Sequence, residues 1–446
     1  MTTRAIALGA LALGLCAAFP AHAADDDLAQ IRREMKSLRG DYEHKIRELE
    51  RRLKKAEERA EKAEAAAAAA PAPVPAAAPE PPPPPAPAPV ASQSAFNPSI
   101  SVILNGSFNH SENDPGAARI PGFILDEEAG LPDRGFSLDE SEVTLSANVD
   151  HAFFASLTIA LESEGEVAVE EAFVQTTSLP WGLTAKAGRF FSGIGYLNER
   201  HAHTWDFVDQ PLPYRAFLGG QYGDDGIEVR WLAPTDFFLE FGAEWYRGDA
   251  FPSGNADDNG TGTFAAFAKT GGDLDEESSW LAGLSYLKAK ADQRDVDGDV
   301  FSGDSHVAIA NVVYKWAPNG NARINNLIVN AEYFFNREDG TFNGVPVDLD
   351  RQGWYVQGVY QFMPQWRAGL RYAGLASEGA SGPLAGSSLD DFGHAPQTWS
   401  ALLEYDTSEF GRLRLQYSYD DSDLSPNNTI QAAYTMAIGA HGAHKF

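Results

Sequence analysis

The amino-acid sequence predicts an all-β fold, a 16-stranded transmembrane antiparallel β-barrel preceded by an N-terminal α-helical coiled coil. Segments of about ten residues with alternating apolar and polar side chains fill residues 98–446, a pattern typical of strands that face lipid on one side. Short turns alternate with long, mostly acidic connections between these segments. No stretch after the N-terminal segment offers the roughly 20 continuous apolar residues that a membrane-spanning helix needs.

Residues 1–23 have the features of a secretory signal peptide. The basic residue Arg4 precedes an apolar run over residues 5–19, and the small residues Ala21 and Ala23 suit cleavage after Ala23. The only cysteine, Cys16, lies in this segment, so we expect a mature chain without disulfide bonds.

Residues 24–64 predict a periplasmic coiled coil, and residues 65–97 predict an Ala/Pro-rich linker. The apolar positions of the first segment follow a heptad pattern: Leu28, Ile31, Met35, Leu38, Tyr42, Ile46, Leu49, Leu53, Ala56, Ala60 and Ala63. Charged residues of both signs fill the other positions and favour self-association along the apolar seam, while a single solvated helix is the alternative. The linker is expected to be an extended, semi-rigid spacer between the helix and the barrel.

The predicted barrel strands share a length of roughly ten residues. They lie near 98–109, 137–149, 152–162, 167–178, 181–190, 225–233, 236–247, 262–270, 278–288, 305–317, 325–336, 352–363, 365–374, 397–406, 410–419 and 428–446. The long connections lie near 110–136, 191–224, 248–261, 289–304, 337–351 and 375–396. An even number of strands with short turns at one end and long loops at the other is the plan of a bacterial outer-membrane barrel.

The alternation separates a lipid-facing side from a lumen-facing side on each strand. In the segment 410–419, Leu413 and Leu415 share one face, and Arg412 and Arg414 share the other. An arginine facing lipid near the midplane costs about 2 to 4 kcal/mol, so we expect the arginine face to point inward. The alternative, a soluble β-sandwich, would require a dry core on one face of each strand, and these faces carry polar residues.

The longest of these connections, residues 191–224, is by order the third extracellular loop. In sixteen-stranded porins the third loop folds into the lumen and narrows it, and we expect the same here, with the aromatic residues buried against the inner wall. We predict a pore constriction in which acidic loop residues face basic wall residues: Glu199, Asp206 and Asp209 opposite Arg367, Arg371, Arg412 and Arg414. Opposed charges across a narrow pore would create a transverse field that sorts solutes. The alternative is that the arginines only pair with acidic neighbours and stiffen the wall.

His201 and His203 in the same loop, with Asp206 and Asp209 close by, offer nitrogen and oxygen ligands for Zn²⁺. Hydrogen-bonded loop histidines are the alternative. A second acidic group at residues 295–299 is similar to a Ca²⁺ loop but lacks the distal Glu of an EF-hand, so a solvated loop is the alternative there. No cofactor is expected to be required, and Zn²⁺ or Ca²⁺ are the ions that could bind.

The segment around this loop resembles a family of proteobacterial porin-like proteins often labelled zinc-regulated outer-membrane receptors, which are distantly similar to phosphate-selective porins. The residues that carry the resemblance are Gly188-Arg189-Phe190-Phe191, Leu197-Asn198, His201, His203, Trp205-Asp206-Phe207-Val208-Asp209-Gln210-Pro211-Leu212, Tyr214-Arg215 and Asp225-Gly226. The resemblance implies a homotrimeric, 16-stranded outer-membrane channel. Energy-coupled uptake is not expected, because a coiled coil and a proline-rich spacer stand where a receptor would have its plug domain.

Charge and motifs limit the function classes further. The barrel region holds 21 basic and 50 acidic residues, which argues against a phosphate-selective pore and against a nucleic-acid-binding surface. No nucleophile motif or phosphate-binding loop indicates an enzyme. The C-terminal Phe446 after an alternating strand resembles the signal read by the barrel assembly machinery, and the acidic loops suit bridging by divalent ions to lipopolysaccharide.

The sequence therefore favours a passive channel for small hydrophilic solutes or cations, including a divalent metal such as zinc. One alternative is a structural protein tethered to peptidoglycan or another periplasmic partner through the coiled coil. A second alternative is a specific metal receptor centred on His201 and His203.

Overall fold

The computed structural model describes residues 98–126, 129–161, 165–254, 261–380 and 382–439. The predicted signal peptide (1–23), coiled coil (24–64) and linker (65–97) lie outside the described residues, as does the predicted assembly signal at Phe446. Those four assignments stay predictions.

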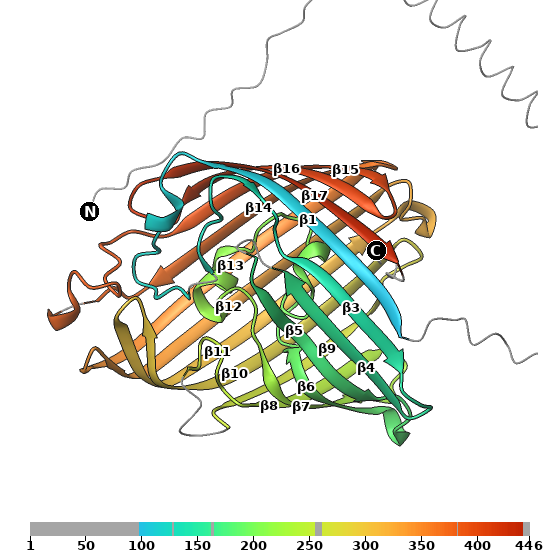
Figure 1. Ribbon diagram of the computed structural model, residues 1–446, viewed down its shortest axis with the longest axis horizontal. Helices are drawn as coiled ribbons and strands as arrows, with labels where there is room; N and C mark the ends of the chain where they lie inside the picture. Colours follow the sequence, from blue (N-terminus) through green and yellow to red (C-terminus); the bar gives the residue numbers. More distant parts are fainter. Residues whose placement is uncertain (1–97, 127–128, 162–164, 255–260, 381, 440–446) are drawn as a thin grey trace, which may run out of the picture. The chain divides into compact units, whose positions relative to one another are not determined.

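The described chain forms one closed antiparallel β-sheet (Figure 1). Its strands are β1 (Ser99–Ser111), β2 (Gly135–Ser137), β3 (Ser141–Asn148), β4 (Phe153–Leu161), β5 (Val167–Thr176), β6 (Leu183–Phe191), β7 (Gly223–Leu232), β8 (Phe238–Tyr246), β9 (Thr263–Asp273), β10 (Ser278–Val296), β11 (Asp299–Trp316), β12 (Asn326–Phe342), β13 (Val345–Met363), β14 (Trp366–Ser377), β15 (Gln397–Ser408), β16 (Gly411–Asp421) and β17 (Asn427–Gly439). One α-helix, α2 (Leu212–Leu218), and the 3₁₀ helices η1 (Pro115–Ala117), η3 (Pro180–Gly182), η4 (Ala202–Thr204), η6 (Pro318–Gly320) and η7 (Gly382–Leu384) lie in the connections.

The sheet closes into a barrel because the first strand, β1, pairs with the last strand, β17, as well as with β3, which follows it in the chain. It pairs with β17 over residues 101–111 and with β3 over residues 99–103, and the short β2 pairs with β1 beside β3. Because β2 and β3 share one place in the wall, the barrel has sixteen wall strands, as predicted. Closure leaves the sheet without a free edge that could pair with another chain.

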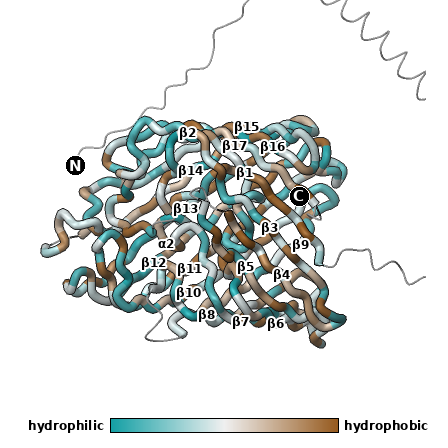
Figure 2. The backbone as a smooth tube through the Cα atoms, in the orientation of Figure 1, coloured by the Kyte–Doolittle hydropathy of each residue, from teal (hydrophilic) through white to brown (hydrophobic). Residues whose placement is uncertain are grey.

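Side chains on the wall strands alternate between the lumen and the outer surface. On β16, Leu413 is 45 % exposed and Leu415 is 52 % exposed, whereas Arg412 and Arg414 are buried on the inner side. Hydrophobic and hydrophilic residues accordingly alternate along the strands in Figure 2. The predicted inward direction of the arginines is confirmed. Among the described residues, no helix is long and apolar enough to cross a membrane.

Two predicted long loops are wrong. The segments 289–304 and 337–351 are the ends of long strands, and the turns between them contain only Asp297-Gly298 and Asn343-Gly344. All four turn residues have positive φ, between 49° and 87°, which is the conformation that Asp-Gly and Asn-Gly favour in two-residue hairpins. Both dipeptides were visible in the sequence, but the flanking residues are polar and lack the alternation used to recognise strands.

The lumen contains an apolar core, which the expectation of polar inner faces did not foresee. The loop 191–224 folds inside the barrel, and all seven residues of α2 are buried. The inner side of the wall contributes apolar side chains to this core, among them Phe190, Tyr246, Leu287, Val307, Ile309, Phe334, Tyr355 and Leu375. The ring of Phe217 in α2 stacks on Phe334 at 6.1 Å between centroids. Because burial of one large apolar side chain stabilises by roughly 1.5–3 kcal/mol, this packing holds the loop inside the barrel.

Candidate functional site

The loop of residues 191–224 carries the candidate site, and α2 fixes its second half. Pro213 lies in the first turn of α2, where a missing N–H has no cost. Gly219 ends the helix with φ of 62°, and the Gly220 N–H donates to the Tyr214 carbonyl at 3.0 Å. Glycine suits this left-handed position, so the sequence itself sets where the helix stops.

A buried glutamate on β12 joins the two halves of the loop. The Glu332 carboxylate accepts hydrogen bonds from the Tyr214 hydroxyl at 2.8 Å, the Tyr355 hydroxyl at 2.6 Å and the Tyr196 N–H at 3.0 Å. The Leu197 N–H also approaches it at 3.4 Å. Glu332 was not among the residues predicted from the sequence, although an acidic residue at an inward position amid apolar neighbours is a signal that indicates such a role.

The beginning of the loop is held by a second buried glutamate. Glu244 on β8 accepts from the Gly193 N–H at 2.8 Å and from the Ser192 hydroxyl. These contacts bind the backbone of the loop to the wall at the point where the chain leaves β6.

The four arginines predicted for the constriction bind the middle of the loop to β14 and β16. Arg367 pairs with Asp206 at 2.5 Å, and Arg371 pairs with Asp209. Arg412 and Arg414 donate to backbone carbonyls of the loop, including that of Trp205 at 2.9 Å and 3.1 Å. The structure thus pairs two of the predicted arginines with predicted acidic residues, whereas Arg412 and Arg414 bind the loop backbone. Their role in a pore constriction stays a prediction.

Glu199 is bound to the other side of the barrel. It pairs with Arg230 on β7 and, at 3.4 Å, with Lys269 on β9. Counted along the strand pairings, β7 is the sixth and β15 the fourteenth of the sixteen wall strands, so β7 lies opposite the β14–β16 wall. Residues 199–209 therefore run across the lumen from one wall to the other.

Glu199 and Asp206, which pair with basic residues of the wall, have lowered pKa values. Burial alone would raise the pKa of Glu199, but attraction to Arg230 and Lys269 outweighs it and lowers this pKa to about 2. Burial would also raise the pKa of Asp206, but attraction to Arg367 outweighs burial and lowers this pKa. The ion pairs of Glu199 and Asp206 therefore persist well below neutral pH.

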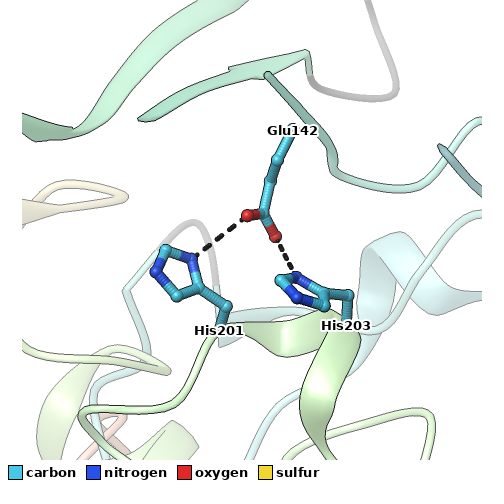
Figure 3. A group of neighbouring side chains, drawn as sticks. All are labelled: Glu142, His201 and His203. Atoms are coloured by element: carbon cyan, nitrogen blue, oxygen red, sulfur yellow. Dashed lines mark hydrogen bonds and ion pairs between the residues drawn. The ribbon is translucent and has the colours of Figure 1, made fainter. Parts of the chain in front are cut away.

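His201 and His203 lie on either side of Glu142, a buried residue at the start of β3 (Figure 3). His201 Nδ1 is 3.2 Å from Glu142 Oε2, and His203 Nδ1 is 2.6 Å from Glu142 Oε1. Glu142 is about sixty residues away in the chain and was not among the residues predicted from the sequence. Asp206 and Asp209, expected near the histidines, pair with Arg367 and Arg371 instead.

Two further glutamates reach His201 from β5. Its Nδ1 is 3.1 Å from Glu170 Oε2, and its Nε2 is 3.1 Å from Glu171 Oε2. The register between β4 and β5 shifts by one residue at this point, and such a bulge re-aims consecutive side chains. Burial opposes a charged imidazole, but the hydrogen bonds to Glu142, Glu170 and Glu171 outweigh it and hold the pKa of His201 well above its ordinary value.

A cavity of about 400 Å³ lies between the loop and the wall. Loop residues Trp205, Asp209 and Gln210 line one side of it, and the polar wall residues Ser400 and Asp420 are part of the other. The lining of this space thus combines polar side chains, which can replace water around a hydrophilic solute, with apolar ones such as Val208 and Leu212.

A closed sixteen-stranded antiparallel wall with a long loop folded into its lumen is the fold of outer-membrane porins. The structure is similar to that of OmpT with loop L8 deleted, an outer membrane protein of Vibrio cholerae, with a TM-score of 0.50, 14% sequence identity, and coverage of 76% of this chain and 98% of that chain. It is also similar to Pseudomonas putida OprB, with a TM-score of 0.50, 13% identity, and coverage of 77% and 94%.

No family model matches the chain. An uncharacterised protein of Aquifex aeolicus (strain VF5) is 30% identical over 389 residues, which cover 80% of this chain and 81% of that protein. The chain belongs to the same family as that protein.

Proposed function

We propose that this protein is an outer-membrane channel for the passive diffusion of small hydrophilic solutes and cations. The observation that carries the proposal is the loop of residues 191–224, which crosses the lumen and is bound to opposite walls by ion pairs. A loop fixed in this way narrows the lumen without closing the barrel at its ends. The cavity of about 400 Å³ beside the loop, with polar side chains in its lining, supports a path for hydrophilic solutes.

We place the narrowest part of the path along the charged contacts of the loop. These are the acidic residues Glu199, Asp206 and Asp209 and the arginines Arg367, Arg371, Arg412 and Arg414. Fixed charges of both signs beside a narrow path orient dipolar solutes even when they are paired. The excess of acidic over basic residues in the barrel region, 50 against 21, concentrates cations near the mouth and favours cations such as Zn²⁺ over anions.

Single-channel recording in planar bilayers tests the proposal. The refolded full-length protein is expected to give stable conductance steps and, in a KCl gradient, a reversal potential of cation-preferring sign. The double variant Asp206→Asn/Asp209→Asn should change the conductance and reduce this preference, whereas Glu409→Gln, in an exposed turn, should leave both unchanged. A correctly folded barrel that conducts no ions would contradict the proposal.

The predicted homotrimer and the predicted periplasmic tether are separate proposals that the same preparation can test. Conductance steps in groups of three would support a trimer. Co-sedimentation with peptidoglycan that is lost on deletion of residues 24–95 would support the tether, whose residues lie outside the described part of the chain.

A further inference from the structure

We propose that Glu142, His201 and His203 bind a Zn²⁺ ion inside the barrel, with Glu140 and Glu170 on the carboxylate side of the site. One potential ligand atom each of Glu142, His201 and His203 lies within 4.8 Å of the others. The same is true of Glu140, Glu142 and Glu170. The two groups share Glu142, so the five side chains lie close together where the loop meets β5 and the start of β3. Figure 3 shows the three members Glu142, His201 and His203.

The hydrogen bonding of His201 suits a metal ligand. Its Nε2 is 3.1 Å from Glu171 Oε2, and a carboxylate in this position keeps the proton on Nε2, as it does for many metal-binding histidines. The lone pair of Nδ1 then faces Glu142 Oε2 at 3.2 Å and Glu170 Oε2 at 3.1 Å. Three electron-rich atoms converge at these distances when a proton or a metal cation lies between them, and Zn²⁺ would take the place of the proton on Nδ1.

The negative charge of the cluster favours binding of a divalent cation. Glu140, Glu142, Glu170 and Glu171 carry four negative charges when ionised, and His201 and His203 together could supply at most two positive charges. Among the described residues, no lysine or arginine pairs with any of the four glutamates. Oε1 of Glu140 is buried and has no hydrogen-bond partner in the described chain. A divalent cation would bind this atom and reduce the repulsion within the cluster.

The ligand set favours zinc over calcium or magnesium. Imidazole nitrogen suits Zn²⁺, and two histidines with one carboxylate form a common set of three protein ligands for it. Ca²⁺ and Mg²⁺ prefer oxygen ligands alone. Because the ligands come from the loop and from the β3–β5 side of the wall, zinc would cross-link the loop to the wall there. This cross-link would lie beside Arg412 of β16, which donates to the His203 carbonyl.

The test is zinc binding by the untagged full-length protein in detergent, measured by competition with a chromophoric chelator using ZnCl₂ as the probe. We expect about one bound Zn²⁺ per chain, little effect of excess CaCl₂, and an X-ray absorption spectrum with Zn–N distances of about 2.0–2.1 Å from histidine. The variant His201→Asn/His203→Asn should lose affinity by about 100-fold or more. Glu171→Gln, which changes only the carboxylate behind His201, should lose roughly 10- to 100-fold.

His306→Ala/His394→Ala is the matched control, because His306 also lies near a carboxylate, 3.7 Å from Asp339, but outside the cluster. This control should bind zinc as the unchanged protein does. The heat-dependent shift in gel mobility reports whether each variant still forms a closed barrel. Two results would overturn the proposal. In the first, the His201/His203 variant binds zinc as tightly as the unchanged protein. In the second, the unchanged protein binds no more zinc than that variant. Neither outcome depends on whether the barrel conducts ions.

Discussion

Removal of the Glu332 carboxylate is expected to release the loop from the wall. In Glu332→Ala the hydroxyls of Tyr214 and Tyr355 and the N–H of Tyr196 lose the acceptor shown by the structure, while the Leu197 N–H keeps the Tyr214 oxygen at 3.0 Å. Tyr214 and Tyr196 belong to the loop, whereas Tyr355 lies on the wall strand β13, so two of these bonds join the loop to the wall. A net loss of about 1 kcal/mol for each of the two lowers the stability of the docked loop by about 2 kcal/mol. Since 1.4 kcal/mol corresponds to a factor of ten, the population with an open loop should rise roughly 30-fold.

Trypsin cleavage after Arg200 and Arg215 measures this population, because both residues lie in the loop and Arg215 is buried when the loop is docked. When opening is fast relative to cleavage, the cleavage rate follows the open population, so it should rise by the same factor. Single-channel current should also become noisier. Glu409→Ala, which removes an exposed glutamate from a turn, is the control and should leave both readouts unchanged. Equal trypsin resistance of Glu332→Ala and the unchanged protein, with the barrel intact, would refute this account of the anchoring.

Three further predictions concern charge, turn geometry and the lipid face. The pKa of Glu199 is lowered to about 2, so its ion pairs stabilise the docked loop fully above pH ~4.5 and weaken as the pH falls towards 2. The resistance of the unchanged protein to pepsin should therefore decline as the pH falls. In Glu199→Gln this decline should be less steep. Gly344 has φ of 78° and open space around it, so Gly344→Ala should lower the free energy of unfolding in urea by about 1 kcal/mol, whereas Gly272→Ala, also in open space but without positive φ, should not. Leu415→Arg should lower the stability of the barrel in lipid vesicles by roughly 2–4 kcal/mol, and a cost below 1 kcal/mol would contradict the outward orientation of this face.

The wall of the barrel could be predicted from the sequence because its signal is local. Leu415 and Arg414 are neighbours in the chain and face opposite sides, so alternation alone separates lipid from lumen. The apolar core could not be predicted in this way. Phe334 faces inward and Phe335 faces outward, and periodicity cannot tell which of two apolar neighbours packs against a loop from elsewhere in the chain.

The candidate site was partly predictable for the same reason. His201 and His203 stand two residues apart in an unusual loop, and the sequence shows this directly. Their neighbours Glu142, Glu170 and Glu171 come from strands that the barrel brings beside the loop, and the bulge in β5 has no signature in the sequence. The acidic residues closest in the chain, Asp206 and Asp209, are bound by arginines more than 150 residues away.

The arginine contacts of the loop also determine when the loop can pack during assembly of the barrel. Arg414 donates to the carbonyl of Phe207, which precedes it by 207 residues. The loop therefore reaches its final packing only after β14 and β16 have joined the wall, late in the assembly of the chain. Contacts between residues so far apart in sequence form slowly, so we expect the lumen of a nascent barrel to remain wider than that of the mature protein until the last strands are in place.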